Sequence, residues 1–192
     1  MDAICEATLR CVARWGVTKT TLEDVAREAG VGRATVYRTF RGGKAHVLRA
    51  VLVREVDRFL AEVRAAVEAA PGELEDVVVA GVTTAARRLA GHEALAFLLA
   101  HEPDAVLPHV GFGRMGHLLD AAAAFADAHL APFIADPDER TRAAQWLARV
   151  VLTYVFHPAA GADLTDEAST RRLLRTFVLP GLHAPTPQET QR

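Results

Sequence analysis

The sequence is poor in cysteine, in lysine and in long apolar runs. Cysteine occurs only at Cys5 and Cys11, and lysine only at Lys19 and Lys44. Six residues apart on one helix, the two cysteines would lie roughly 9 Å apart along its axis, which excludes a disulfide between them. Free thiols suit a reducing compartment, so we expect a cytoplasmic protein. No apolar run reaches the length of about 18 residues that a membrane span requires.

The sequence also lacks the local patterns of catalytic and metal sites. It contains no Gly-x-Ser-x-Gly, no phosphate-binding loop and no Cys-x-x-Cys. Its eight histidines include no pair at i and i+4, the spacing that places two imidazoles on one face of a helix. We therefore expect no catalytic residue, no metal site and no cofactor.

The charge is unevenly distributed along the chain, although the net charge is only −2. Residues 1–50 carry nine Lys and Arg against five Asp and Glu, a net charge of +4, and the remainder has a net charge of −6. A basic segment over residues 1–50, followed by an acidic remainder, indicates that residues 1–50 bind a polyanion.

Apolar periodicity and regularly placed Gly and Pro residues predict an all-helical chain. In the first helix, over residues 2–15, the apolar stripe ends before Gly16, which we expect at the helix C-terminus. The second is expected to run to about Ala29, with Thr20 as its N-cap and Glu23 completing a capping box. Further helices are predicted over 33–40, 44–70, 73–91, 93–101, 113–130, 138–156 and 166–179.

Residues 20–40 have the pattern of a helix-turn-helix, with the glycine-containing turn Gly30-Val31-Gly32 between two short helices. We expect Leu22, Val25 and Ala26 of the first helix to pack against Val31, Val36 and Phe40. The second helix then exposes a basic surface that also carries hydroxyl and methyl groups, as reading of the major groove requires.

The segments TTLEDVA (20–26) and GVGRATVYRTF (30–40), followed by Gly43-Lys44 and Val47-Leu48, resemble the signature of the TetR (tetracycline repressor-like) family of transcriptional regulators. The resemblance covers roughly residues 4–50. It implies a three-helix DNA-binding head with a helix-turn-helix, followed by a helical ligand-binding and dimerisation domain. We place these at residues 1–48 and 49–182, with a flexible tail over 183–192.

Expected roles follow for the residues of the head. Arg33 can reach a guanine edge through its two-donor fork, and Ala34 and Thr35 can offer methyl groups to thymine. Thr21 and Lys44 lie at helix starts, where free amides favour a phosphate, and the family position of Tyr37 implies another phosphate contact. The expected DNA-binding residues are Thr20, Thr21, Arg33, Ala34, Thr35, Tyr37, Arg38 and Lys44.

The body contains apolar and aromatic residues at helical spacing, which form either an ordinary core or the lining of a cavity. The resemblance implies a small-molecule effector, and an apolar lining indicates that it is mostly apolar. The candidate ligand-binding residues are Phe97, Leu98, His101, Phe112, Met115, Leu119 and Trp146. The candidate dimer residues are Trp146, Arg149, Val150, Thr153, Leu173, Leu174 and Phe177. The alternative is that these residues belong to the internal core of one subunit.

These observations predict a ligand-responsive regulator, most simply a repressor. As a homodimer it would bind a palindromic operator in double-stranded DNA, and a small effector would release it. We therefore expect it to be associated with the bacterial nucleoid. The alternative is an apolar-ligand carrier or sensor whose helix-turn-helix is vestigial.

Overall fold

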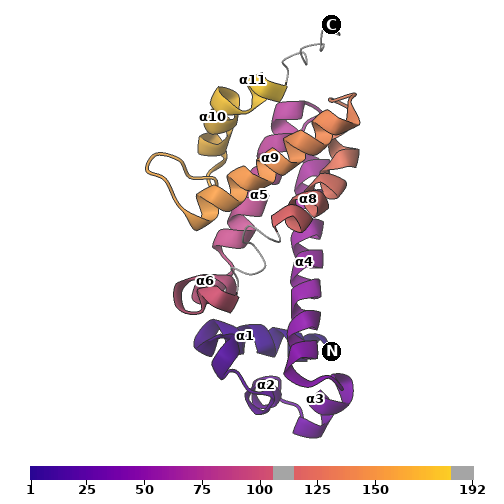
Figure 1. The fold of residues 1–192 in the computed structure, drawn as a ribbon, viewed down its shortest axis with the longest axis vertical. Helices are drawn as coiled ribbons and strands as arrows, with labels where there is room; N and C mark the ends of the chain where they lie inside the picture. The colour runs from indigo at the N-terminus through magenta and orange to yellow at the C-terminus, as the bar shows by residue number, and fades with distance from the viewer. Residues whose placement is uncertain (106–114, 183–192) are drawn as a thin grey trace, which may run out of the picture. The chain divides into compact units, whose positions relative to one another are not determined.

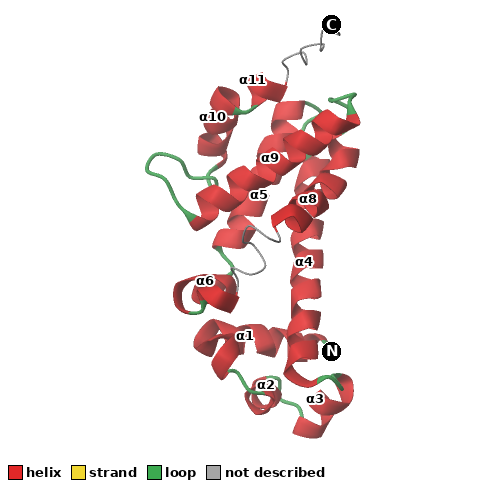
Figure 2. Cartoon of the chain, in the orientation of Figure 1, coloured by secondary structure: helices red, strands yellow, loops and turns green. Residues whose placement is uncertain are grey.

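The computed structural model of the chain describes residues 1–105 and 115–182, and every regular element in this part is a helix (Figures 1 and 2). The predicted all-helical class is confirmed. The helices are α1 (Asp2–Lys19), α2 (Leu22–Glu28), α3 (Arg33–Thr39), α4 (Gly43–Ala69), α5 (Leu74–Ala90), α6 (Glu93–His101), α8 (Met115–Leu130), α9 (Pro137–Phe156), α10 (Glu167–Phe177) and α11 (Leu179–Leu182). The predicted tail over 183–192 lies outside the described residues.

Helix α1 differs most from its predicted bounds. Gly16 adopts φ 78° and ψ 175°, the left-handed φ expected of a terminal glycine, but the chain then resumes a helical turn as far as Lys19. The predicted end of the first regular helix at Gly16 is therefore confirmed. The further helical turn after this kink was not predicted.

The chain forms two compact units. Unit 1 comprises Met1–Glu62 and Arg88–Leu118, and unit 2 comprises Val63–Arg87 and Leu119–Arg192. Helices α4 and α5 each continue from one unit into the other. Unit 1 contains α6 as well as α1 to α3, so the units do not follow the expected boundary at residue 48. The predicted division of roles between residues 1–48 and 49–182 stays a prediction.

The core of unit 1 joins α1, α2, α3 and the first turns of α4, which we call the head (residues 1–51). Its apolar side chains come from all four helices, because each helix presents one apolar stripe to the others. The buried members are Ile4, Cys5, Ala7, Cys11, Leu22, Val25, Ala26, Val36, Phe40, Val47 and Val51. This confirms the predicted packing of α2 against α3.

Ion pairs extend unit 1 along α4. Arg54 binds Asp2 and Glu6 of α1 at 2.7 and 2.9 Å. The next residue, Glu55, accepts from Arg88 at the end of α5 at 2.5 Å. Arg54, Glu55 and Arg88 are partly buried, where ion pairs are screened less than on an open surface, whereas Asp2 is exposed. They fix the middle of α4 to α1 and to the end of α5.

Unit 2 is held by apolar contacts and by ion pairs between helices distant in sequence. The buried apolar face of α5 includes Val78, Val79 and Val82. Arg171 of α10 donates to Glu75 and Asp76 at the start of α5, both at 2.7 Å. The hydrogen bonds that Arg171 donates to Asp76 and Glu75 raise its pKa.

Candidate nucleic-acid interface

Helix α3 is anchored by one face and exposed on the other. Val36 is 0% exposed, and Phe40, at the helix C-cap, is also buried. Gly30 takes φ +66° in the turn before α3, a conformation that a side chain would strain. The buried anchors and the tight turn fix the direction of α3 relative to α2.

The exposed face of α3 carries the side chains expected to read DNA. Arg33, Ala34, Tyr37 and Arg38 are exposed, and Thr35 is half-buried. About two helical turns therefore present two guanidinium groups, a phenol, a methyl group and a hydroxyl. This combination can hydrogen-bond base edges and phosphates from one short helix.

Arg33 is already partnered in the free protein. Its guanidinium lies 2.6 Å from a carboxylate oxygen of Glu23 on α2 and over the ring of Tyr37, 5.4 Å from the centroid. The Tyr37 side chain and the Glu23 carboxylate raise the pKa of Arg33, so the guanidinium stays charged. The sequence analysis treated Glu23 only as a capping residue and missed this pairing, because no local pattern relates it to Arg33 across the turn.

The N-terminus of α2 is capped one residue later than predicted. Thr21 is the N-cap, its hydroxyl accepts from the Asp24 amide, and the Asp24 carboxylate accepts from the Thr21 amide. The predicted capping box of Thr20 and Glu23 is therefore wrong. Thr20 is buried and donates its hydroxyl to the Gly16 carbonyl at 2.6 Å. Its side chain faces the interior of unit 1, whereas Thr21 is exposed at the helix start.

Lys44 lies in the first turn of α4, as expected for a phosphate contact. Its ammonium group donates to the Thr18 carbonyl at 3.2 Å. An ammonium group has three donors, so this bond leaves two for a phosphate. Lys44 therefore joins the start of α4 to the last turn of α1 while remaining able to bind an anion.

The structure does not bring the candidate ligand-binding residues together within one unit. Phe97, Leu98 and His101 belong to unit 1, where the Phe97 and His101 rings stack with centroids 4.4 Å apart. Leu119 and Trp146 belong to unit 2, Leu119 buried and Trp146 exposed. Phe112 lies outside the described residues, and the side chain of Met115 is not described. A ligand site at these residues stays a prediction.

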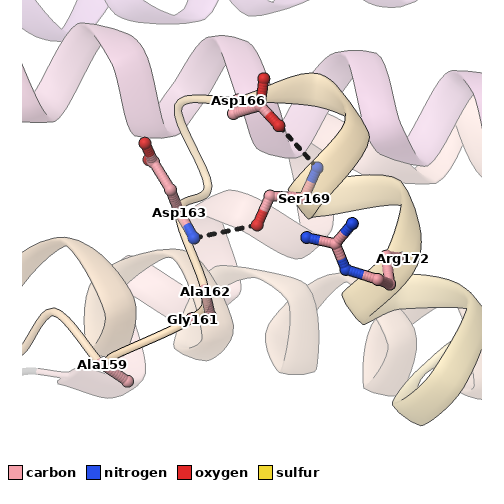
Figure 3. A pocket seen from close by; sticks show the side chains of 7 residues that line it. All are labelled: Ala159, Gly161, Ala162, Asp163, Asp166, Ser169 and Arg172. Carbon is pink, nitrogen blue, oxygen red and sulfur yellow. Dashed lines mark hydrogen bonds between the residues drawn. The ribbon is translucent and has the colours of Figure 1, made fainter.

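An open pocket of about 390 Å³ lies at the loop between α9 and α10 (Figure 3). None of the candidate ligand-binding residues lines it. Two polar side chains of this pocket already accept hydrogen bonds from the backbone. The Ser169 hydroxyl accepts from the Asp163 amide, and the Asp166 carboxylate caps α10 by accepting from the Ser169 amide. The lining residues are Ala159, Gly161, Ala162, Asp163, Asp166, Ser169 and Arg172. Residues 1–105 and 115–182 contain no cluster of three or more His, Cys, Asp or Glu placed to hold a metal ion.

The candidate dimer residues divide between core and surface. Val150 and Leu174 are buried within unit 2, so these two side chains belong to the subunit's own interior. Leu173 is half-buried, whereas Arg149 and Thr153 are exposed. Trp146 and Phe177 are 49% and 72% exposed, which is unusual for large apolar side chains. The prediction of a dimer interface therefore rests on the exposed residues Trp146, Arg149, Thr153 and Phe177.

The anchored core and the exposed basic helix define a helix-turn-helix DNA-binding protein. Comparison with known proteins agrees: residues 4–51 match the model of the bacterial regulatory proteins of the tetR family. Residues 4–51 are therefore a tetR-type DNA-binding head, and the chain is similar over most of its length to HTH-type transcriptional regulators. No helix among the described residues is long and apolar enough to span a membrane.

Similarity extends beyond the head. The chain is 29% identical over 183 residues to an HTH-type transcriptional regulator of Mycobacterium tuberculosis (strain ATCC 25618 / H37Rv), covering 93% of this chain and 83% of the relative. The crystal structure of the TetR family repressor AlkX from Dietzia sp. has a TM-score of 0.65 at 22% identity, covering 94% and 96% of the two chains. The fatty acid degradation regulator FadR from Bacillus halodurans has a TM-score of 0.61 at 21% identity, covering 92% and 95%. The curated relatives are transcriptional regulators, a role that involves no catalysis.

Proposed function

We propose that the protein is a repressor that binds a palindromic operator as a homodimer and is released by a small, mostly apolar effector. The observation that carries the proposal is helix α3. Its position is fixed by Val36 and Phe40, while Arg33, Tyr37 and Arg38 on its other face are exposed to solvent and accessible to DNA. A carrier with a vestigial helix-turn-helix has no use for this combination.

Dimerisation is supported by the small size of the reading surface. One α3 helix of seven residues can contact only one half-site, and a net charge of +4 supplies limited non-specific affinity. Two α3 helices placed in successive major grooves would read a palindrome. The exposed Trp146 and Phe177 provide apolar surface for the contact between subunits.

A buried hydroxyl in unit 2 supports an effector site there. Thr83 of α5 is 3% exposed, and its hydroxyl has no hydrogen-bond partner among the described residues. Other helical threonines donate to the carbonyl four residues earlier, as Thr8 and Thr176 do. An unsatisfied buried hydroxyl costs about 1–3 kcal/mol. A polar atom on an otherwise apolar ligand would satisfy it.

The effector would act on the head through α4. This helix runs without interruption from Gly43 to Ala69 and belongs to unit 1 up to Glu62 and to unit 2 from Val63. A ligand that shifts the dimer from 99:1 to 1:99 must bind the inactive state more tightly by about 5.5 kcal/mol. Shared between two sites, less than about 3 kcal/mol is needed at each, which burial of one apolar group supplies.

The test is selection of bound sequences from genomic DNA, followed by measurement of affinity for the selected site. Arg33→Ala should weaken binding by about 5- to 150-fold and relax specificity at one base pair. Lys44→Ala should weaken all sequences alike and reduce the salt dependence by about one counterion. Arg172→Ala, which removes the same charge from an exposed site in unit 2, should leave binding unchanged. A wild-type protein that selects no palindrome would refute the proposal.

A further inference from the structure

The kink in α1 creates a second helix start inside unit 1. Because Gly16 leaves the helical conformation, the amides of Val17 and Thr18 lose their partners one turn earlier in α1. Such free amides carry partial positive charge and favour a carboxylate. Sequence analysis predicted the interruption at Gly16 but not the helical turn that follows it.

The carboxylate that occupies this position comes from Glu102, at the C-cap of α6 and also in unit 1. The Val17 amide donates to Oε2 at 2.8 Å, and the Thr18 amide donates to both carboxylate oxygens at 3.2 Å. A side chain at position 16 would collide with this carboxylate, so the glycine also makes room for it. Glu102 thus joins α6 to α1 across more than eighty residues of sequence.

The turn that Glu102 holds is connected directly to the DNA-binding surface. The Thr18 carbonyl accepts from the ammonium group of Lys44, the expected phosphate contact. The Gly16 carbonyl accepts from Thr20, which is followed by Thr21, the N-cap of α2. One carboxylate therefore fixes a turn whose two carbonyls position residues at the starts of α4 and α2.

We propose that Glu102 is a positioning residue for DNA binding, which acts by holding Lys44 and the start of α2 in place. The inference rests on the proposed operator binding, because its consequence is measured as operator affinity. It extends the DNA-binding machinery to a residue of α6, which contacts no DNA itself. Removing the carboxylate frees the turn at Val17 and Thr18, and Lys44 then loses its fixed place.

The experiment compares Glu102→Ala, Glu102→Gln and the control Asp104→Ala, which removes an exposed carboxylate two residues away. Amide hydrogen exchange at Val17 and Thr18 should be at least about tenfold faster in Glu102→Ala, since charge-assisted hydrogen bonds are lost. Operator affinity should fall by about fivefold or more. Glu102→Gln keeps one acceptor oxygen and should restore part of both effects. Asp104→Ala should change neither.

A double-mutant cycle with Lys44→Ala separates positioning from a general loss of stability. If Glu102 acts through Lys44, the Lys44→Ala substitution should weaken binding less in the Glu102→Ala background than in the wild type. Equal effects in both backgrounds, or wild-type affinity of Glu102→Ala, would overturn the inference. If Glu102→Ala does not fold, the same cycle with Glu102→Gln decides. A wild-type protein that binds no DNA overturns both the inference and the proposed function, whereas a wild-type protein that binds isolates the role of Glu102.

Discussion

The ion pair between Glu23 and Arg33 should restrain DNA binding. The two groups lie 2.6 Å apart, and both side chains are accessible to solvent. To reach a base edge, the Arg33 guanidinium must leave or share this partner. Glu23→Gln removes the negative charge with almost no change in shape, so it should tighten operator binding.

The size of the gain follows from the exposure of the pair. Exposed ion pairs are weak because water and salt screen them, so breaking this one should cost a factor of only about 1.4 to 5 in affinity. Glu23→Gln should recover this factor, and more at low salt, because one negative charge near the phosphates is also removed. The melting temperature should hardly change, since the pair contributes little to stability.

The assay is fluorescence anisotropy with labelled operator at several salt concentrations. It compares the wild type, Glu23→Gln, Arg33→Ala and the double variant. Glu68→Gln, at an exposed position near the end of α4, controls for overall charge. The gain from Glu23→Gln should mostly disappear in the Arg33→Ala background. Weaker binding by Glu23→Gln, or an equal gain without Arg33, would refute the argument.

Other predictions concern stability and assembly. Val36→Ala should lower the free energy of unfolding by about 2–3 kcal/mol, measured by denaturant titration, because it removes two buried carbons and leaves a cavity. Thr83→Val should raise it by about 1 kcal/mol without effector, because an unpaired hydroxyl is replaced by a methyl group; a decrease would show that the hydroxyl has a partner. The hydrogen bond from Arg10 lowers the pKa of Glu28 below its ordinary value of 4.5. The ionised Glu28 therefore stabilises the folded state fully above that pH, and this contribution is lost as the pH falls through the folded-state pKa. Below about pH 4.5 the melting temperature of the wild type should therefore fall more steeply than that of Glu28→Gln. Phe177→Asp should convert a dimer to monomers in sedimentation, and an unchanged dimer would place the interface elsewhere.

Much of the fold could be predicted because helices are local. The breaker Gly30 and the apolar spacing of Val25, Val36 and Phe40 determined the helix-turn-helix, and the structure confirms it. The N-cap of α2 was harder to predict, because either of two consecutive threonines, Thr20 or Thr21, could cap the helix. The choice of Thr21 depends on Thr20 bonding to the Gly16 carbonyl, a contact with the preceding helix.

The remaining features depend on contacts between distant residues. Glu102 follows α6 with no pattern that relates it to Val17, so sequence alone could not assign its role. Apolar spacing identified Val150 and Leu174 as members of a packed face, but it did not tell a subunit's own core from an interface between subunits. Both are buried within unit 2.

The two cysteines of the chain give the head an internal probe of its own opening. Cys5 and Cys11 lie in the head core, and burial raises the pKa of both thiols. Because the thiolate is the reactive form, an alkylating reagent can modify them only when α1 separates from its neighbours. The ratio of the labelling rate to that of an unfolded thiol therefore measures the equilibrium for local opening. Because unit 2 contains no cysteine, this signal comes from the head alone when all 192 residues are present, with no engineered label.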